Sequence, residues 1–312
     1  MGKKKKDTME LRFYEVPQNE YVLALLGDSW IRDYGHDESN LHFHNLMEIG
    51  YCKHGTGELI LNEESKPYEP AMVSIIPQNY PHVTISDTDS GPSFWEYLFF
   101  DPMVIIQELY PDNPVIQKKI LQMVNQKALF FHEWENPGVS VLVKMIMDEM
   151  RQKKKRFHEC VRGLMTALFA ELLRMCENDV AEDEIRKKAG VSQITPALEY
   201  VRNEYANNIR VEELAKASHM SETHFRRVFE SYINMSPMDY INLMRVQKAC
   251  DIMKKTNDSM DVVAQKVGFT TTSTFNRNFK KYLNTSPYQW KISPENYERK
   301  LLNYNISALK GW

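Results

Sequence analysis

An internal repeat in the last third of the chain restricts its possible folds more than any other feature. The stretch ELAKASHMSETHFRRVFESYINMSP, residues 213–237, aligns with VVAQKVGFTTTSTFNRNFKKYLNTSP, residues 262–287. Both copies carry two Phe residues four positions apart, followed by Tyr-x-Asn-x-Ser-Pro. A repeat with a period of about 50 residues indicates that one structural unit occurs twice.

Each copy predicts a helix, a tight turn and a second helix. In the first copy, the small side chain of Ala215 allows the two helices to approach closely. The turn falls at His219 in the first copy and at Gly268 in the second. Phe225 and Phe229 lie one helical turn apart, so the spacing predicts that both face the core of the unit.

The opposite face of each second helix is polar, and its residue types suit contacts with DNA. Arg can bond guanine through two hydrogen bonds, Asn can do the same with adenine, and Ser or Thr can contact bases or phosphate. The alternative interpretation is an ordinary solvated surface. Because both copies place Arg at the same position, we favour DNA contact, and the predicted DNA-facing residues are Thr223, Arg226, Arg227, Thr272, Ser273, Asn276 and Arg277.

The segment between the copies predicts a long connecting helix that begins near Pro237. About 18 residues rising 1.5 Å each give a connector of roughly 27 Å. Successive major-groove sites on one face of DNA lie about 34 Å apart. A stiff connector of this length could therefore present both second helices to the same face of a duplex.

Residues 193–292 resemble the DNA-binding domain of the bacterial AraC/XylS family, which consists of two helix-turn-helix units joined by a long helix. The residues that carry the resemblance include Ala215, Ser221, Phe225, Phe229, Pro237, Arg245, Ala249, Ala264, Gly268, Phe269, Phe275, Phe279, Lys280, Ser286 and Pro287. This chain departs from the family pattern at Asn234 and Asn284, where Gly is usual, and at Trp290-Lys291, where an Arg is usual. The resemblance implies a regulator that binds double-stranded DNA, forms a homodimer, answers to a small-molecule effector and, as an activator, contacts RNA polymerase.

The amino-terminal half predicts a different architecture. Residues 11–100 contain short β-rich runs separated by polar, Gly or Pro-containing turns, which is typical of a β-barrel or sandwich. Residues 101–178 have helical periodicity, and residues 179–192 read as a charged linker. The clearest helix carries an apolar stripe that could be interior packing or a dimer seam, formed by Val161, Leu164, Met165, Leu168, Phe169, Leu172 and Met175.

A pattern of histidine and glutamate residues marks the predicted β domain. The spacing His42-x-His44-x3-Glu48, with His82 further on, resembles the cupin motif, in which such residues bind a divalent metal. Alternation along a strand places the two imidazoles of the His-x-His pair on one face. In AraC-type regulators a cupin-like barrel serves as an effector pocket, so the resemblance implies His44, Glu48 and His82 as pocket residues with Trp95 and Tyr97 as walls, and a sugar-sized effector suits them. A metal site at His42, His44, Glu48 and His82 and a purely structural role stay open as alternatives.

Composition restricts the remaining function classes. Residues 191–312 carry 17 basic and 12 acidic residues, whereas residues 1–190 carry 22 and 30, so the halves suit different partners. The four cysteines form no Cys-x-x-Cys pair and no apolar run reaches the about 20 residues of a membrane span, which together favour a cytoplasmic protein. Residues 1–10 predict a disordered basic end, and residues 293–312 a carboxy-terminal extension.

These observations predict a two-domain chain, with an all-β cupin-like barrel and following helices before an all-α DNA-binding domain. The expected function is that of an effector-responsive transcriptional activator that reads two adjacent major-groove sites. No phosphate-binding or hydrolase motif is present, and we expect neither an enzyme nor a cofactor. The alternative is a metal-dependent cupin enzyme fused to a DNA-binding domain.

Overall fold

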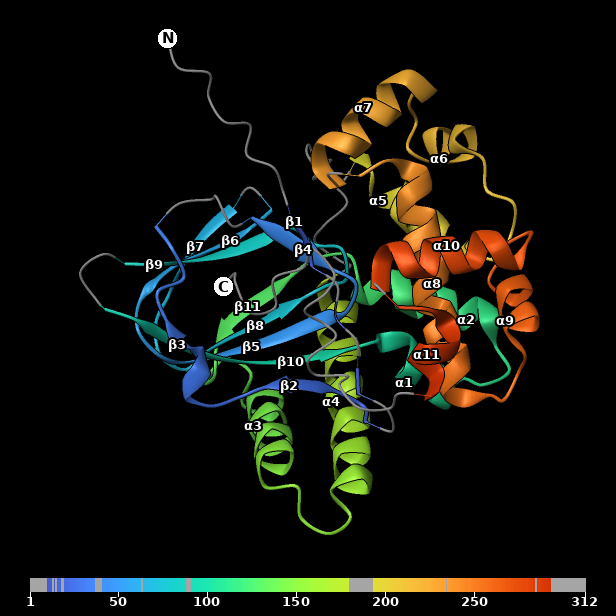
Figure 1. The fold of residues 1–312 in the computed structure, drawn as a ribbon. Coiled ribbons are helices and arrows are strands. Elements are labelled where there is room, and N and C mark those ends of the chain that lie inside the picture. Colours follow the sequence, from blue (N-terminus) through green and yellow to red (C-terminus); the bar gives the residue numbers. More distant parts are fainter. Residues whose placement is uncertain are drawn as a thin grey trace. The chain divides into compact units, whose positions relative to one another are not determined.

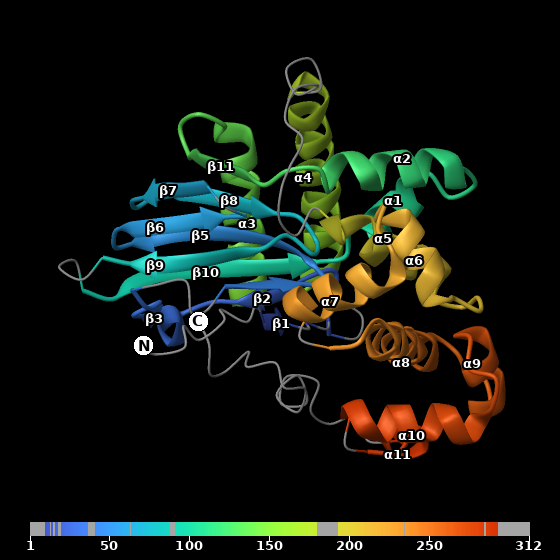
Figure 2. The same cartoon turned by 90° about the horizontal axis from the view of Figure 1, so that it is seen from above.

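The computed structural model describes residues 10–12, 14, 16–17, 20–36, 41–62, 64–87, 91–179, 193–233, 235–283 and 285–292. The predicted basic end at 1–10 lies outside these residues except for Glu10, which belongs to a short strand, and the predicted linker at 179–192 lies outside them except for Asp179, which ends a helix. The extension at 293–312, Asn234 and Asn284 also lie outside the described residues. The chain divides into two compact units: an amino-terminal unit of residues 13–187 with 310–312, and a carboxy-terminal unit of residues 188–309 with 1–12, which include the short strand β1 (Glu10–Arg12). Figures 1 and 2 show the elements of each unit.

Two antiparallel β-sheets form the centre of the amino-terminal unit (Figure 1). Within this unit, the first sheet has the strand order β4 (His42–His44), β9 (His82–Ser86), β6 (Gly57–Leu61) and β7 (Glu64–Tyr68). The second has the order β11 (Leu129–His132), β8 (Met72–Ile76), β5 (Met47–His54), β10 (Ser93–Phe100) and β2 (Leu23–Leu25). The short strand β3 (Ile31–Arg32), which follows the 3-10 helix η1 (Asp28–Trp30), also pairs with β10.

Alternation along β10 gives the second sheet two chemically different faces. Trp95, Tyr97 and Phe99 point toward the first sheet, where Trp95 contacts Tyr68 of β7 with ring centroids 5.1 Å apart. Leu98 and Phe100 belong to the apolar core on the other face. The inner faces of the two sheets therefore pack together, while the outer face of the second sheet needs a cover.

Helices provide that cover: α1 (Pro102–Leu109), α2 (Pro114–Val124), α3 (Pro137–Gln152) and α4 (Phe157–Asp179). The side chains of α3 and α4 join those of the second sheet in one apolar core, and Figure 1 shows both helices against this sheet. Val161, Met165, Leu168, Phe169 and Leu172 are buried in this core, and Leu164 and Met175 pack against it. The apolar stripe of α4 is thus interior packing, which answers the question that the sequence left open.

From residue 193 on, the part of the carboxy-terminal unit that the structure describes consists of helices. They are α5 (Thr195–Glu204), α6 (Val211–Ala217), α7 (Glu222–Ile233), α8 (Pro237–Lys255), α9 (Met260–Lys266), α10 (Thr272–Leu283) and α11 (Pro287–Ile292). The connecting helix α8 begins as predicted, because the Ser236 hydroxyl accepts a hydrogen bond from the Asp239 amide and Pro237 occupies the first turn. Its 19 residues give a length of about 28 Å.

The described structure confirms a β-rich region followed by a helical carboxy-terminal domain. The predicted helical segment 101–178 differs in one respect, because β11 lies within it and pairs with β8. None of the helices in the described part of the chain has the length and apolar character that a bilayer-spanning segment needs.

Candidate functional site

The two predicted helix-turn-helix units close their turns with the same backbone hydrogen bonds. In the first unit, the Met220 amide donates to the Ala215 carbonyl at 2.9 Å, and in the second, the Phe269 amide donates to the Ala264 carbonyl at 2.9 Å. The residue before each of these donors has a positive φ, 55° at His219 and 88° at Gly268. The repeat in the sequence is therefore a repeat in backbone geometry.

The aromatic pairs of the repeat form the cores of the two units. Phe225 and Phe229 are fully buried, as are Phe275 and Phe279, and within each pair the rings lie 5.3 and 5.5 Å apart. Burial of these rings on one face of α7 and α10 directs the opposite faces outward. The packing that the sequence predicted is thus confirmed for both helices.

Six of the seven predicted DNA-facing side chains are exposed: Thr223, Arg226, Arg227, Ser273, Asn276 and Arg277. The seventh, Thr272, is half-buried, and its hydroxyl donates a hydrogen bond to the Asp261 carboxylate of α9. The two reading faces therefore begin differently, since α7 has the acidic Glu222 at the position that Thr272 occupies in α10.

Side chains that the sequence interpretation did not single out hold the arginines of α7. The Arg226 guanidinium donates to the Glu222 carboxylate through Nε at 3.0 Å and Nη2 at 2.7 Å. Arg227 Nη2 lies 3.2 Å from His224 Nδ1. All four side chains are exposed, so these contacts are weak and can be exchanged for contacts with DNA. Spacings of three and four residues along a helix could have indicated both pairs.

One buried arginine connects the second helix-turn-helix unit to the loop that precedes the first helix-turn-helix unit. Arg245 of α8 is 9% exposed, and it donates from Nε to the Tyr205 carbonyl at 2.7 Å and from Nη2 to the Asn207 carbonyl at 2.8 Å. The same guanidinium lies 5.7 Å from the ring centroid of Phe269. Arg245 therefore connects α8, the α5–α6 loop and the second helix-turn-helix unit.

At the departure from the family pattern near the end of the domain, Trp290 and Lys291 both contact the rest of the domain. Lys291 donates from Nζ to the Thr256 carbonyl at 3.2 Å and to the Asp258 carbonyl at 3.4 Å, just beyond the end of α8. Trp290 is buried against Phe279, with ring centroids 6.1 Å apart.

The histidines and the glutamate of the cupin-like pattern meet in the interior of the amino-terminal unit. His42 and His44 of β4 and His82 of β9 place ligand atoms within 4.8 Å of one another. Glu48 of β5 lies on the facing sheet, with Oε2 3.1 Å from His44 Nε2 and 3.6 Å from His82 Nε2. All four side chains are buried. The predicted cluster is therefore assembled from three strands and both sheets.

The environment of the cluster favours an ionised carboxylate beside imidazole. Burial alone would raise the pKa of Glu48, but the neighbouring His82 and His44 outweigh it and lower that pKa to about 2. Burial lowers the pKa of His44, although the hydrogen bond to Glu48 opposes this effect. An anionic oxygen thus faces imidazole rings in a region closed to bulk water.

The two predicted wall residues lie next to each other on the inner face of β10. The rings of Trp95 and Tyr97 are stacked with centroids 6.1 Å apart, and both side chains are buried. Tyr97 is followed on the same face by Phe99, whose ring lies 5.3 Å from that of His44. The structure therefore brings all five predicted effector residues into one interior lined by aromatic rings.

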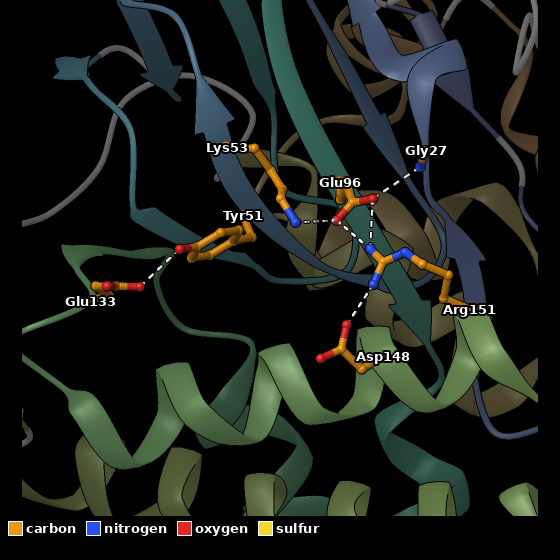
Figure 3. A network of polar contacts seen from close by, with 7 residues as sticks. All are labelled: Gly27, Tyr51, Lys53, Glu96, Glu133, Asp148 and Arg151. Atoms are coloured by element: carbon orange, nitrogen blue, oxygen red, sulfur yellow. Dashed lines mark hydrogen bonds and ion pairs between the residues drawn. The ribbon is translucent and has the colours of Figure 1, made fainter. Parts of the chain in front are cut away.

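A polar clamp that sequence reasoning missed lies on the outer face of the same strand (Figure 3). Glu96 of β10 accepts hydrogen bonds at 2.8 Å on both carboxylate oxygens from Arg151 of α3, and one at 2.9 Å from the Gly27 amide. Lys53 of β5 lies 3.3 Å from the same carboxylate. Burial raises the pKa of Glu96, but Arg151, Gly27 and Lys53 outweigh this effect and lower it. The clamp fixes the end of α3 to the second sheet.

Comparison with known proteins finds similarity to transcriptional regulators. Residues 214–292 match the model of a helix-turn-helix domain. The chain is 21% identical over 248 residues to the raffinose operon transcriptional regulatory protein RafR of Pediococcus pentosaceus, covering 78% of this chain and 84% of RafR. It is 21% identical over 251 residues to the transcriptional activator RhaS of Escherichia coli, covering 79% and 85%. Among solved structures, an apo form of ToxT from Vibrio cholerae covers 88% of this chain and 98% of its own, at 15% identity and a TM-score of 0.42.

The repeated turn, the exposed polar helix faces and these relatives define the chain as a helix-turn-helix transcriptional regulator. The matched helix-turn-helix model lies within the carboxy-terminal unit, which is therefore the DNA-binding domain. The relatives reported above are regulators rather than enzymes.

Proposed function

We infer that the chain is an effector-responsive transcriptional activator that reads two adjacent major-groove sites, one with α7 and one with α10. The observation that carries this proposal is the second occurrence of the same turn, with Arg227 and Arg277 exposed at matching positions after it. Arg227 and Arg277 supply the donor pairs that guanine accepts in the major groove. Thr223, Arg226, Thr272, Ser273 and Asn276 complete the two reading faces.

The internal bracing of the domain supports simultaneous reading by both helices. The connector α8 is a continuous helix, and its Arg245 contacts both the Tyr205 carbonyl, before the first helix-turn-helix unit, and the ring of Phe269 in the second. A domain held in this way has few conformations to lose when both helices enter DNA, so less of the binding free energy is spent on ordering.

The interior between the two sheets is the proposed effector site, with His44, Glu48, His82, Trp95 and Tyr97 in contact with the effector. Aromatic rings interspersed with a few polar groups suit a small polar molecule such as a sugar. RafR, a regulator of a raffinose operon, is among the relatives. Because the proposed contact residues are buried, an effector that binds there must rearrange their packing, and this rearrangement is the signal.

The strand β10 offers a direct route for that signal. Its inner face carries Trp95 and Tyr97, and its outer face carries Glu96, which is clamped to Arg151 of α3. A shift of β10 on effector binding would therefore move α3. An effector can act in this way only through a difference in its affinity for the two arrangements.

The proposal includes a homodimer that forms through an exposed apolar face of α3. The exposed apolar side chains Val141 and Met145 lie one turn apart on α3 and are 50% and 48% exposed. A homodimer formed through α3 would cover them and would link dimer geometry to the Glu96–Arg151 clamp. As an activator, the DNA-bound dimer would contact RNA polymerase in the cytoplasm.

Enrichment of genomic DNA tests this function. The purified chain is mixed at physiological salt with sheared DNA from its source organism, and the bound fragments are sequenced with and without pooled small metabolites. We expect a few promoter-proximal fragments, lost in an Arg226→Ala/Arg277→Ala variant. Uniform recovery of all fragments under both conditions would contradict sequence-specific regulation.

A further inference from the structure

The first residue of α7 differs in charge from its counterpart in α10. Glu222 begins α7 directly after Ser221, whose hydroxyl accepts a hydrogen bond at 3.4 Å from the amide three residues further on. In α10 the equivalent first residue is Thr272, and the Thr271 hydroxyl before it accepts the equivalent hydrogen bond at 3.2 Å. The two helices therefore begin with the same capping geometry, but only α7 begins with a carboxylate.

The carboxylate of Glu222 contacts one edge of an arginine on the same helix. Arg226 donates to it from Nε at 3.0 Å and from Nη2 at 2.7 Å, and both hydrogen bonds end on Oε1. The other carboxylate oxygen, Oε2, and the other terminal guanidinium nitrogen, Nη1, take no part in this pair. The side chains are 45% and 46% exposed. The pair therefore presents a hydrogen-bond acceptor beside N–H donors at the start of α7.

We propose that Glu222 determines the base specificity of α7 by accepting a hydrogen bond from the N4 amino group of a cytosine. This role rests on the proposed function, because it requires α7 to enter a major groove. In helix-turn-helix proteins the first residues of the second helix contact the base edges. Cytosine presents an amino donor in that groove, and Glu is one of the side chains that accept from it. Arg226, held beside Glu222, supplies donors for a guanine of the same or the neighbouring base pair.

The same carboxylate discriminates against the other bases. Thymine presents O4 in the major groove, and guanine presents O6 and N7. These atoms are acceptors, so each would face the negative oxygen of Glu222 without a hydrogen between them. Adenine has an amino donor, but its N7 acceptor lies beside it. Cytosine is therefore the expected base, followed by adenine, with guanine and thymine the least favoured.

A carboxylate at this position also lowers the affinity for DNA of any sequence. Contacts with phosphate supply most of the sequence-independent affinity, and Glu222 both repels phosphates and occupies Arg226. In α7 the two arginines are balanced by Glu222 and Glu230, whereas α10 contains three basic residues and no acidic one. Glu222 therefore reduces binding to random DNA while it increases discrimination. An arginine that contacts phosphate has the opposite effect on random DNA.

The competing explanation is a purely structural role. A negative charge in the first turn stabilises a helix, and a Glu–Arg pair four residues apart adds to this stability. If Glu222 did only this, its replacement would change the stability of α7 without changing which base is preferred. Base preference therefore distinguishes the two explanations.

Selection from a random DNA library tests this role on the full chain, with and without pooled small metabolites. The proteins compared are the wild type, Glu222→Gln and Glu230→Gln. Glu230→Gln is the matched control, because it removes the same charge from an exposed position eight residues further along α7. The half-motif that α7 reads is identified as the one lost in Arg226→Ala/Arg227→Ala. We expect a cytosine in that half-motif for the wild type and Glu230→Gln, and no preference at that base pair for Glu222→Gln.

Titrations with defined duplexes measure the size of the effect. For the wild type, replacing that cytosine by thymine should weaken binding roughly 5- to 150-fold. Glu222→Gln should bind the two duplexes about equally and should bind random DNA more tightly than the wild type does. Its salt dependence should be steeper by about one unit of slope, because Arg226 becomes available to a phosphate. The titration of the wild type needs no variant, so it remains decisive if Glu222→Gln fails to fold.

Three results would overturn the role of Glu222 and leave the regulator function standing. The first is an unchanged motif in Glu222→Gln, and the second is a wild type that selects no cytosine in the α7 half-motif. The third is a cytosine preference that Glu230→Gln loses as well, since charge alone would then be the cause. A wild type that enriches no motif under either condition would instead contradict the proposed function, and the role of Glu222 with it.

Discussion

The two helix-turn-helix units have the same backbone geometry but differ in most of the side chains that face outward. Both close the turn with equivalent hydrogen bonds and bury a Phe pair. On the reading faces, however, α7 presents Arg226 paired with Glu222, while α10 presents Asn276. The comparison shows that the helix-turn-helix geometry depends on a few buried positions. The two surfaces are therefore free to specialise, and we expect them to read different base sequences.

The turns themselves differ for a steric reason. A Cβ at Gly268 would lie 2.6 Å from the Ala206 carbonyl oxygen and 2.8 Å from that of Tyr205, so the second turn has no room for a side chain. At the equivalent position of the first unit, His219 is exposed and its side chain extends into solvent. The second turn is thus packed against the rest of the domain, whereas the first is not.

The largest expected effect comes from removing a core ring. Phe275→Ala should destabilise the second unit by about 3–5 kcal/mol, because it removes a fully buried ring and leaves a cavity. Hydrogen exchange should show lost protection in α9 and α10 and retained protection in α6 and α7. Phe225→Ala is the matched variant and should give the reverse pattern. An equal loss of exchange protection in both helix-turn-helix units, in either variant, would show that the two units unfold together.

The next effect concerns the crowded turn. Gly268→Ala should destabilise the second unit by about 1–3 kcal/mol, since the added Cβ meets backbone oxygens and the residue has a positive φ. Local hydrogen exchange of α9 and α10 measures this change. Gly163→Ala in α4, where nothing lies within 4 Å of the added atom, is the control and should not destabilise the chain. An undisturbed second unit in Gly268→Ala would contradict the packing of the turn.

A third effect distinguishes base reading from phosphate contact. Arg277→Ala should weaken binding to the selected duplex by about 1–3 kcal/mol if this residue reads a base. Binding to random DNA should then weaken much less than binding to the selected duplex. If Arg277 contacts only phosphate, binding to all sequences should weaken together and the salt dependence should fall by about one unit of slope. Titrations at several salt concentrations, repeated with Arg227→Ala, show whether the two units use the matching position in the same way.

The smallest expected effect is a gain in stability. His219→Gly relieves a left-handed conformation that costs a non-glycine residue about 1–2 kcal/mol. The more flexible unfolded chain offsets about 0.4–1 kcal/mol of this gain. The net result should be a stabilisation of the first unit by roughly 0.5 kcal/mol, visible as slower exchange in α6 and α7. Faster exchange would show that His219 makes a contact that outweighs the strain.

Much of the DNA-binding domain could be predicted from the sequence because its signals are local. The Phe spacing, the helix start at Pro237 and the turn at Gly268 each act within a few residues, and the repeat shows them twice. Thr272 shows the limit of this approach, since its contact with Asp261 of the preceding helix cannot be inferred from periodicity.

The features that the sequence did not reveal are long-range. Arg245 contacts carbonyls about 40 residues away, and Arg151 binds Glu96 from 55 residues away. The strand β11 was missed because four mostly apolar residues between helices have no distinctive period. By contrast, the His/Glu cluster was expected despite its long range because its spacing resembles the cupin motif, whereas strand alternation alone predicts only that His42 and His44 share a face.

The central claim is that one chain reads two different half-sites with its two units. Selection from a random DNA library tests it most directly, with the wild type, a first-unit variant Arg226→Ala/Arg227→Ala and a second-unit variant Asn276→Ala/Arg277→Ala, each with and without pooled effectors. We expect two distinct half-motifs about one helical turn apart for the wild type. Each variant should lose one half-motif and retain the other. A single motif, or the loss of both half-motifs in either variant, would contradict independent reading by the two units.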